Sequence, residues 1–159
     1  MTKILSTVDE TRDFGRALAA VLRAGDLVVL TGPLGAGKTA LAQGVGAGLN
    51  VRGDVTSPTF VIARVHQPDS ARGGVVPLVH VDAYRLGNVA DPIGEVDALD
   101  LDATLEDSVT LVEWGSGVVS QLSDEHLEIR LDRRDDDSRV VELIPRGSDW
   151  SARTSALVR

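Results

Sequence analysis

Hydrophobic residues near the N-terminus recur with helical spacing, at Phe14, Ala17, Leu18, Val21 and Leu22. Because this spacing puts all of them on one face of an α-helix, it predicts an amphipathic helix that packs on a core. Thr7 or Asp9 can cap its start, and Gly25 is placed to end it. A second helix is expected over residues 38–49, where glycines lower the intrinsic helicity but permit close packing on a sheet.

Short apolar runs bounded by turn residues predict the strands of a sheet. They span residues 26–31, 60–65, 78–82, 109–114, 127–132 and 140–144. The last two flank a turn at residues 133–138 and predict a C-terminal β-hairpin. Because strands alternate with helices along the chain, we expect a single α/β domain whose sheet is mixed, mostly parallel and flanked by helices.

Three other stretches carry weaker patterns. Residues 87–107 are acidic and predict one or two short helices, and the apolar positions at 118, 119 and 122 suggest another. Residues 67–77 are rich in glycine and polar residues, which predicts an exposed hairpin connection. The domain is expected to span residues 1–146, with a weakly patterned tail at 147–159 that is partly disordered.

A glycine-rich turn between the first predicted strand and the second helix is the clearest chemical signal. Its sequence, Gly32-Pro33-Leu34-Gly35-Ala36-Gly37-Lys38-Thr39, fits the phosphate-binding loop of P-loop nucleotide hydrolases. Glycines let the backbone curl so that its N–H groups surround a phosphate, and the following helix adds its positive dipole end. Lys38 supplies a cation for the phosphates, and Thr39 offers a hydroxyl to Mg²⁺.

Carboxylates follow two other predicted strands, at Asp82 and Glu113. Ligands of open α/β sheets bind beyond the carboxyl ends of the strands, so both side chains are candidates for the same site. Asp82 fits the pattern of a Mg²⁺-binding aspartate after an apolar strand, and the glycine-rich loop upstream favours that reading over a helix cap or a solvated acid. Glu113 can bind the metal, orient or deprotonate an attacking water, or be a solvated strand end.

Several other residues have both a functional and a structural interpretation. Thr59 can sense a γ-phosphate from a mobile segment, or belong to an ordinary turn. His80, in the middle of a strand, is read first as a packing histidine. Tyr84 and Trp114 can wall a pocket or simply pack, while Arg85 and Arg139 are candidate phosphate cations or surface arginines.

Composition narrows the function further. The chain has 159 residues, of which 43% are apolar, and no cysteine, so cysteine metal sites and nucleophiles are excluded. No stretch reaches the length of a membrane span, and we expect a cytoplasmic protein without membrane contact. The net charge of −8 disfavours direct gripping of nucleic acid, so an RNA partner is expected to arrive through another protein.

Four segments, taken in order, resemble the TsaE family, the small ATPases of bacterial tRNA threonylcarbamoyladenosine synthesis. They are the loop at 32–39, Thr56-Ser57-Pro58-Thr59-Phe60, His80-Val81-Asp82-Ala83-Tyr84-Arg85-Leu86 and Val112-Glu113-Trp114. Order and spacing match over residues ~5 to ~145, which is nearly the whole chain. The last three segments are far more specific than the loop, which many families share.

The resemblance implies a P-loop fold that binds ATP and Mg²⁺ and hydrolyses ATP slowly. It implies partners, TsaD and TsaB, which transfer the threonylcarbamoyl group to tRNA, so that tRNA is met only through that complex. The nucleotide would be held by Leu34, Gly35, Ala36, Gly37, Lys38 and Thr39, together with Arg139. The metal would be held by Thr39 and Glu113, with Asp82 in the same site and Thr59 in the switch segment.

Two departures from the family pattern stand out. Pro33 occupies a loop position where the family usually has aspartate, and proline removes one N–H and one polar contact. Gly115-Ser116-Gly117 follows Trp114, where the family often has proline and an acid.

Two other functions fit the loop. A small-molecule kinase would need an arginine-rich lid late in the chain, where this sequence predicts strands and an acidic turn. A nucleotide-dependent interaction module with vestigial hydrolysis is the second alternative. A regulatory GTPase is disfavoured, because Asp82-Ala83-Tyr84-Arg85 lacks the Asp-x-x-Gly pattern expected at that position and no Asn-Lys-x-Asp motif occurs in the sequence.

Overall fold

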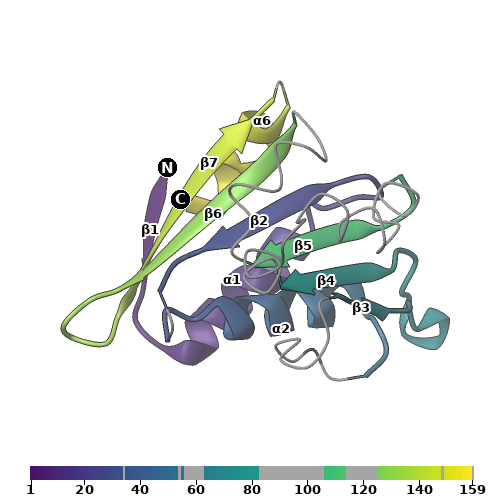
Figure 1. Cartoon of the computed structure of the whole chain (residues 1–159), viewed down its shortest axis with the longest axis horizontal. Helices are drawn as coiled ribbons and strands as arrows, with labels where there is room; N and C mark the ends of the chain where they lie inside the picture. Colours follow the sequence, from purple (N-terminus) through teal and green to yellow (C-terminus); the bar gives the residue numbers. More distant parts are fainter. Residues whose placement is uncertain are drawn as a thin grey trace, which may run out of the picture.

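A seven-stranded sheet forms the centre of the fold, with strand order β1-β7-β6-β2-β5-β4-β3 (Figure 1). The computed structural model describes residues 1–33, 35–53, 55, 63–82, 106–113, 125–147 and 149–158. The strands are β1 (Thr2–Leu5), β2 (Leu27–Thr31), β3 (Ala63–His66), β4 (Leu78–Asp82), β5 (Val109–Glu113), β6 (His126–Arg133) and β7 (Arg139–Arg146). No helix in these ranges is long and apolar enough to cross a membrane.

The sheet is mixed as predicted, but it is not mostly parallel. The pairs β2–β5, β2–β6 and β4–β5 are parallel, so the four central strands run the same way. The pairs β1–β7, β6–β7 and β3–β4 are antiparallel. The difference comes from the edges. Short connections make β6–β7 and β3–β4 hairpins, and β1, for which the sequence predicted no strand, adds a third antiparallel pair.

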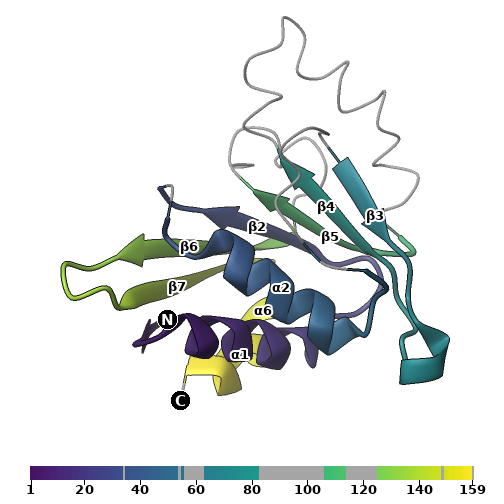
Figure 2. The same ribbon diagram turned by 90° about the horizontal axis from the view of Figure 1, so that it is seen from below.

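The described helices pack on one face of this sheet, as Figure 2 shows from below. They are α1 (Val8–Ala19), α2 (Lys38–Leu49) and α6 (Trp150–Thr154), with short 3₁₀ turns η1 (Ser70–Arg72) and η3 (Ser155–Val158). The predicted cap of α1 is confirmed, because the Thr7 hydroxyl accepts a hydrogen bond of 3.1 Å from the backbone N–H of Glu10. The helix ends at Ala19 rather than near Gly25.

Helices α1 and α2 approach each other closely because glycines line their contact. A Cβ atom on Gly44 would lie 2.1 Å from the carbonyl oxygen of Arg12, and one on Gly15 would lie 2.4 Å from that of Leu41. Both distances are far below a van der Waals contact, so only glycine fits at these positions. The glycines of α2 were expected to face the sheet, but Gly44 packs on α1.

The C-terminal segment, for which the sequence predicted no element, joins the core. Trp150 and Leu157 are buried in the same hydrophobic cluster as Phe14 and Leu18. Arg153 lies 4.1 Å from the Trp150 ring and pairs with the carboxylate of Asp26, which is only 9% exposed. The signal for this packing was a single tryptophan in an otherwise weakly patterned stretch.

Candidate functional site

The glycine-rich loop leaves the end of β2 and leads directly into α2. Gly32, Gly35 and Gly37 have φ angles of 144°, 80° and 105°, in the left-handed region that favours glycine. At Gly32 space is also limiting, because a Cβ there would lie 2.2 Å from the carbonyl oxygen of Leu131 in β6. The glycine spacing of the motif is therefore required by the local backbone.

Lys38 is buried inside this loop, with 6% of its surface exposed. Its ammonium donates to the carbonyl oxygens of Gly32 at 2.6 Å and Pro33 at 2.9 Å. The Pro33 carbonyl also accepts from the N–H of Ala36 at 3.2 Å. Pro33, the departure from the family pattern, thus takes part in the loop through its carbonyl, which proline keeps, rather than through the N–H it lacks.

The start of α2 offers N–H donors to the same space. Gly37 is the N-cap residue and has no side chain to cap the first turn, and Thr39 is the second residue of the helix. Uncapped N–H groups and the positive end of the helix dipole favour a bound anion. The first turn of α2 can therefore hold a phosphate beside Lys38.

Two arginines of the β6–β7 hairpin border the loop. A Cβ atom on Gly37 would lie 3.6 Å from Nε of Arg139 and 3.5 Å from Cγ2 of Thr11 in α1. Arg133, which sequence reasoning did not single out, lies opposite Arg139 in the hairpin, and its Nη1 is 3.8 Å from the Cβ position of Gly35. The signal that could have found Arg133 is its symmetric position across the predicted turn.

The two predicted carboxylate positions lie next to each other at the ends of parallel strands. Asp82 of β4 is the register partner of Glu113 of β5, and Glu113 is in turn the partner of Leu30 in β2. Glu113 is 3% exposed, so it is not a solvated strand end. Its Oε2 lies 2.7 Å from Nε2 of His80, which is fully buried. The sequence predicted the carboxylate but not this partner.

Some predicted site residues lie outside the described residues. They are Leu34 and Thr59, together with Tyr84, Arg85 and Trp114. The predicted helix around residues 118–122 and most of the acidic segment 87–107 are also outside them. For Asp82 the structure describes the backbone position alone. Within the described ranges, no cluster of three or more histidine, cysteine or acidic side chains could hold a metal by itself.

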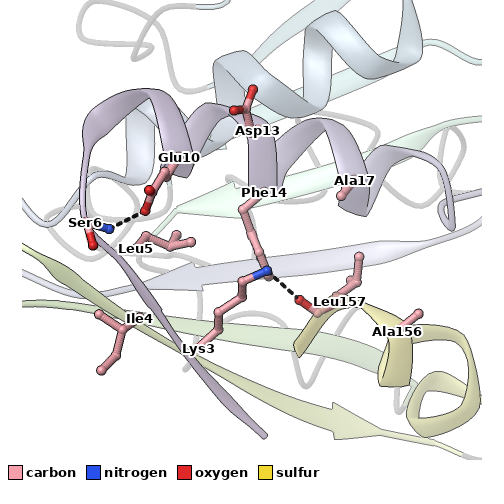
Figure 3. Close-up of a pocket in the computed structure, with 10 residues that line it drawn as sticks. All are labelled: Lys3, Ile4, Leu5, Ser6, Glu10, Asp13, Phe14, Ala17, Ala156 and Leu157. Carbon is pink, nitrogen blue, oxygen red and sulfur yellow. Dashed lines mark hydrogen bonds between the residues drawn. The ribbon is translucent and has the colours of Figure 1, made fainter. Parts of the chain in front are cut away.

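A groove of about 550 Å³ lies away from the glycine-rich loop, between β1, α1 and the C-terminal turn (Figure 3). It is lined by α1 residues such as Glu10 and Phe14, whereas Thr11 and Gly15 face the loop and α2 on another side of the helix. Lys3 crosses it to donate to the Leu157 carbonyl at 3.4 Å. None of the predicted nucleotide-binding residues lines this groove.

Comparison with protein families supports the resemblance of the four segments. The family described as "Threonylcarbamoyl adenosine biosynthesis protein TsaE" matches residues 5–141. A tRNA threonylcarbamoyladenosine biosynthesis protein TsaE of Streptomyces coelicolor is 54% identical over 144 residues, which cover 88% of this chain and 93% of that protein. The protein of the same name from Mycobacterium tuberculosis is 52% identical over 134 residues, covering 83% of this chain and 79% of the relative.

More distant relatives agree in both sequence and fold. The Bacillus subtilis TsaE is 34% identical over 152 residues, covering 95% of this chain and 89% of that protein. The crystal structure of Bacillus subtilis YdiB superposes with a TM-score of 0.78 at 29% identity, and the match covers 99% of this chain and 93% of that one.

Proposed function

This chain belongs to the TsaE family, and on that premise we propose that it binds and hydrolyses ATP with Mg²⁺ in support of tRNA threonylcarbamoyladenosine modification. The observation that carries the proposal is the buried ammonium of Lys38 inside a glycine-rich loop, at the start of α2. A lysine, three glycines with left-handed backbone angles and an uncapped helix start, all at one point, are the features that a phosphate-binding site requires.

The phosphates are proposed to lie over the loop residues Leu34–Thr39. Lys38 supplies a cation that already sits at the centre of the loop, and the N–H groups of the first turn of α2 supply donors. Arg139 supplies a second cation, because its Nε lies near Gly37 at the loop's far end. Arg133, close to Gly35, adds positive charge on the same side.

The oxygen donors near the loop suit magnesium, which prefers carboxylates and hydroxyls. Thr39 and Glu113 would hold the ion, with Asp82 in the same site, since Glu113 and Asp82 are register partners beside the loop strand. When bound, Mg²⁺ neutralises phosphate charge and thereby favours attack at the γ-phosphorus. Glu113 either ligates the ion or accepts a proton from the attacking water, while Thr59 is proposed to sense the γ-phosphate.

The partners are proposed to be TsaD and TsaB, with tRNA reached only through their complex, in the cytoplasm. The β6–β7 hairpin supports this reading over a small-molecule kinase. Both of its strands are paired along the central sheet, β6 to β2 and β7 to β1, so the hairpin is a fixed part of the sheet and not a lid. A kinase lid has to open and close over its substrate.

Phosphate release from ATP, measured while TsaD and TsaB are titrated, tests the proposal. We expect slow hydrolysis by the protein alone and faster hydrolysis with both partners present. Lys38→Ala should abolish tight nucleotide binding, because it removes the cation at the loop centre. A hydrolysis rate that stays the same when TsaD and TsaB are added would contradict the proposed function. Phosphoryl transfer to a metabolite instead of water would favour the small-molecule kinase.

A further inference from the structure

His80 occupies an unusual position for a core histidine. It lies in β4 with no exposed surface, between Arg64 on one neighbouring strand and Leu111 on the other. Its Nε2 is 2.7 Å from Oε2 of Glu113, whose side chain is 4% exposed. A polar ring and a carboxylate, both buried, therefore share a hydrogen bond away from solvent.

The chemistry of the two groups fixes the direction of this bond. In the ionised form that binds a metal, a carboxylate only accepts hydrogen bonds, so the proton must be on Nε2 of His80. Nδ1 of His80 is buried and has no hydrogen-bond partner among the described residues. Among the residues that the structure describes, the ring's hydrogen bond is thus with Glu113, and removing it would leave a buried carboxylate without this donor.

We propose that His80 is a positioning residue: it fixes one oxygen of Glu113 so that the carboxylate presents its other oxygen to Mg²⁺. This inference rests on the proposed Mg²⁺–ATP function of the site. It agrees with the register of the strands, because His80 lies two residues before Asp82, and Asp82 is the direct partner of Glu113. β4 would then contribute to the site both through a carboxylate and through the group that holds the neighbouring carboxylate.

Partners that orient a metal-binding side chain typically change metal affinity by 10- to 100-fold when they are removed. His80→Phe keeps the volume and aromatic shape of the ring but removes the donor. His80→Gln keeps an N–H donor on a side chain of similar reach. His66→Phe is the matched control, because His66 is a buried histidine of the adjacent strand β3 that does not contact Glu113.

Binding of Mn²⁺, followed by electron paramagnetic resonance with a non-hydrolysable ATP analogue present, measures the effect without relying on turnover. We expect His80→Phe to weaken Mn²⁺ binding by about 10-fold or more, and His80→Gln to recover most of that loss. His66→Phe should bind Mn²⁺ as the unmodified protein does. Affinity for the analogue without metal should stay nearly unchanged in all variants, which separates positioning from unfolding.

The outcomes distinguish the two proposals. If the Mn²⁺ affinity of the unmodified protein is the same with and without the ATP analogue, the proposed function fails and this inference fails with it. If nucleotide-dependent binding is present but His80→Phe binds equally tightly, or His80→Gln is as weak as His80→Phe, this inference alone is overturned.

Nuclear magnetic resonance of the unmodified protein decides the matter even if His80→Phe does not fold. We expect the His80 ring to carry its proton on Nε2, and adding Mg²⁺ with the analogue to shift that resonance while the His66 resonance stays in place. A His80 ring protonated on Nδ1, or one insensitive to Mg²⁺ with the analogue, would overturn the inference.

Discussion

The burial of Lys38 alone indicates a binding site for an anion. Lysine is almost never buried without partners, yet Lys38 is 6% exposed. Its ammonium is held by two backbone carbonyls at the start of the loop, which offset the loss of water. The same carbonyls place the charge at the loop centre, so the backbone positions the cation that the phosphates require.

At the residue scale, Glu113→Gln should separate ATP binding from Mg²⁺-dependent turnover. The amide keeps the size of the buried side chain but loses the negative charge that attracts the metal. We expect turnover to fall by at least about 100-fold while some ATP affinity remains. Phosphate release and calorimetric titration of ATP measure the two effects. Equal turnover in Glu113→Gln and the unmodified protein would remove Glu113 from the site.

His66 predicts a pH dependence of stability. Burial lowers the pKa of its ring below the ordinary value of 6.5, and the hydrogen bond to the Arg52 carbonyl opposes this only in part. The unfolded chain therefore binds a proton at a higher pH than the folded chain, so stability is lost as pH falls through about 6.5 toward the folded-state pKa.

Chemical denaturation between pH 5 and 8 should reveal this loss, and the contribution should disappear in His66→Phe. His126→Phe is a suitable control, because His126 is only partly buried and lies on β6, away from β3. An identical pH slope for His66→Phe and the unmodified protein would show that another group controls the dependence.

At the scale of helices and strands, the sequence predicts those elements whose bounds depend on local apolar periodicity and on turn residues. The bounds of α2 and β4 follow from apolar spacing and glycine or acidic turns, and the structure confirms them. The terminal hairpin is also confirmed, although each of its strands is longer than predicted, β6 by one residue at each end and β7 by two residues at its end and one at its start. β1 and α6 were missed because their formation depends on partners distant in the chain. β1 pairs with β7, and α6 is held by the buried Trp150.

The candidate site divides in the same way. The loop residues and the carboxylate positions could be predicted because each follows a strand that the sequence marks clearly. The partnership of His80 with Glu113 could not, since a hydrogen bond from β4 to β5 depends on sheet order. Arg133 could have been found, because it lies opposite Arg139 across the predicted turn. Strand order is a tertiary property that local patterns do not encode.

Gly44→Ala tests whether the contact between α1 and α2 sets the position of the loop. Alanine favours a helix over glycine by about 1 kcal/mol, so an open site would become more stable. Here the added Cβ would lie 2.1 Å from the Arg12 carbonyl oxygen, and we expect a net destabilisation of about 1–3 kcal/mol.

The matched control is Ala47→Gly, at an exposed position of the same helix, which should cost only the helix propensity of about 1 kcal/mol. Denaturant unfolding measures both variants, and ATP affinity reports whether the start of α2 has moved. A stabilised Gly44→Ala would show that the two helices are not in tight contact.

At the scale of the whole molecule, the first strand and the last helical turn are in contact. Lys3 of β1 donates to the carbonyl of Leu157 in η3, so the two ends of the chain lie together, and both are far along the sheet from β3 (Figures 1 and 2). The glycine-rich loop instead lies at the end of β2, in the middle of the strand order. A substitution of Lys3, which contacts η3, should therefore affect stability before it affects nucleotide binding, whereas Leu5 is the register partner of Arg139 beside the loop.

The net charge of the whole molecule affects its direct binding to tRNA. The chain carries −8 at neutral pH, with 24 acidic and 16 basic residues, so long-range electrostatics oppose approach to a polyanion. The arginines near the loop are few and engaged locally, since Arg133 pairs with Asp137 and Arg139 bonds the Asp137 carbonyl. We therefore expect the protein alone to bind tRNA more weakly than about 10⁻⁴ M at physiological salt.

Fluorescence anisotropy of labelled tRNA measures this directly, first with the protein alone and then with TsaD and TsaB added. Binding of tRNA should require TsaD and TsaB, and its affinity should depend on salt as the affinity of TsaD and TsaB alone for tRNA does. The double variant Asp135→Asn with Asp136→Asn, at the exposed hairpin tip, reduces the negative charge and should leave that requirement in place. Micromolar, salt-sensitive binding by the protein alone would mean that a local basic surface outweighs the net charge, and that tRNA is a direct ligand.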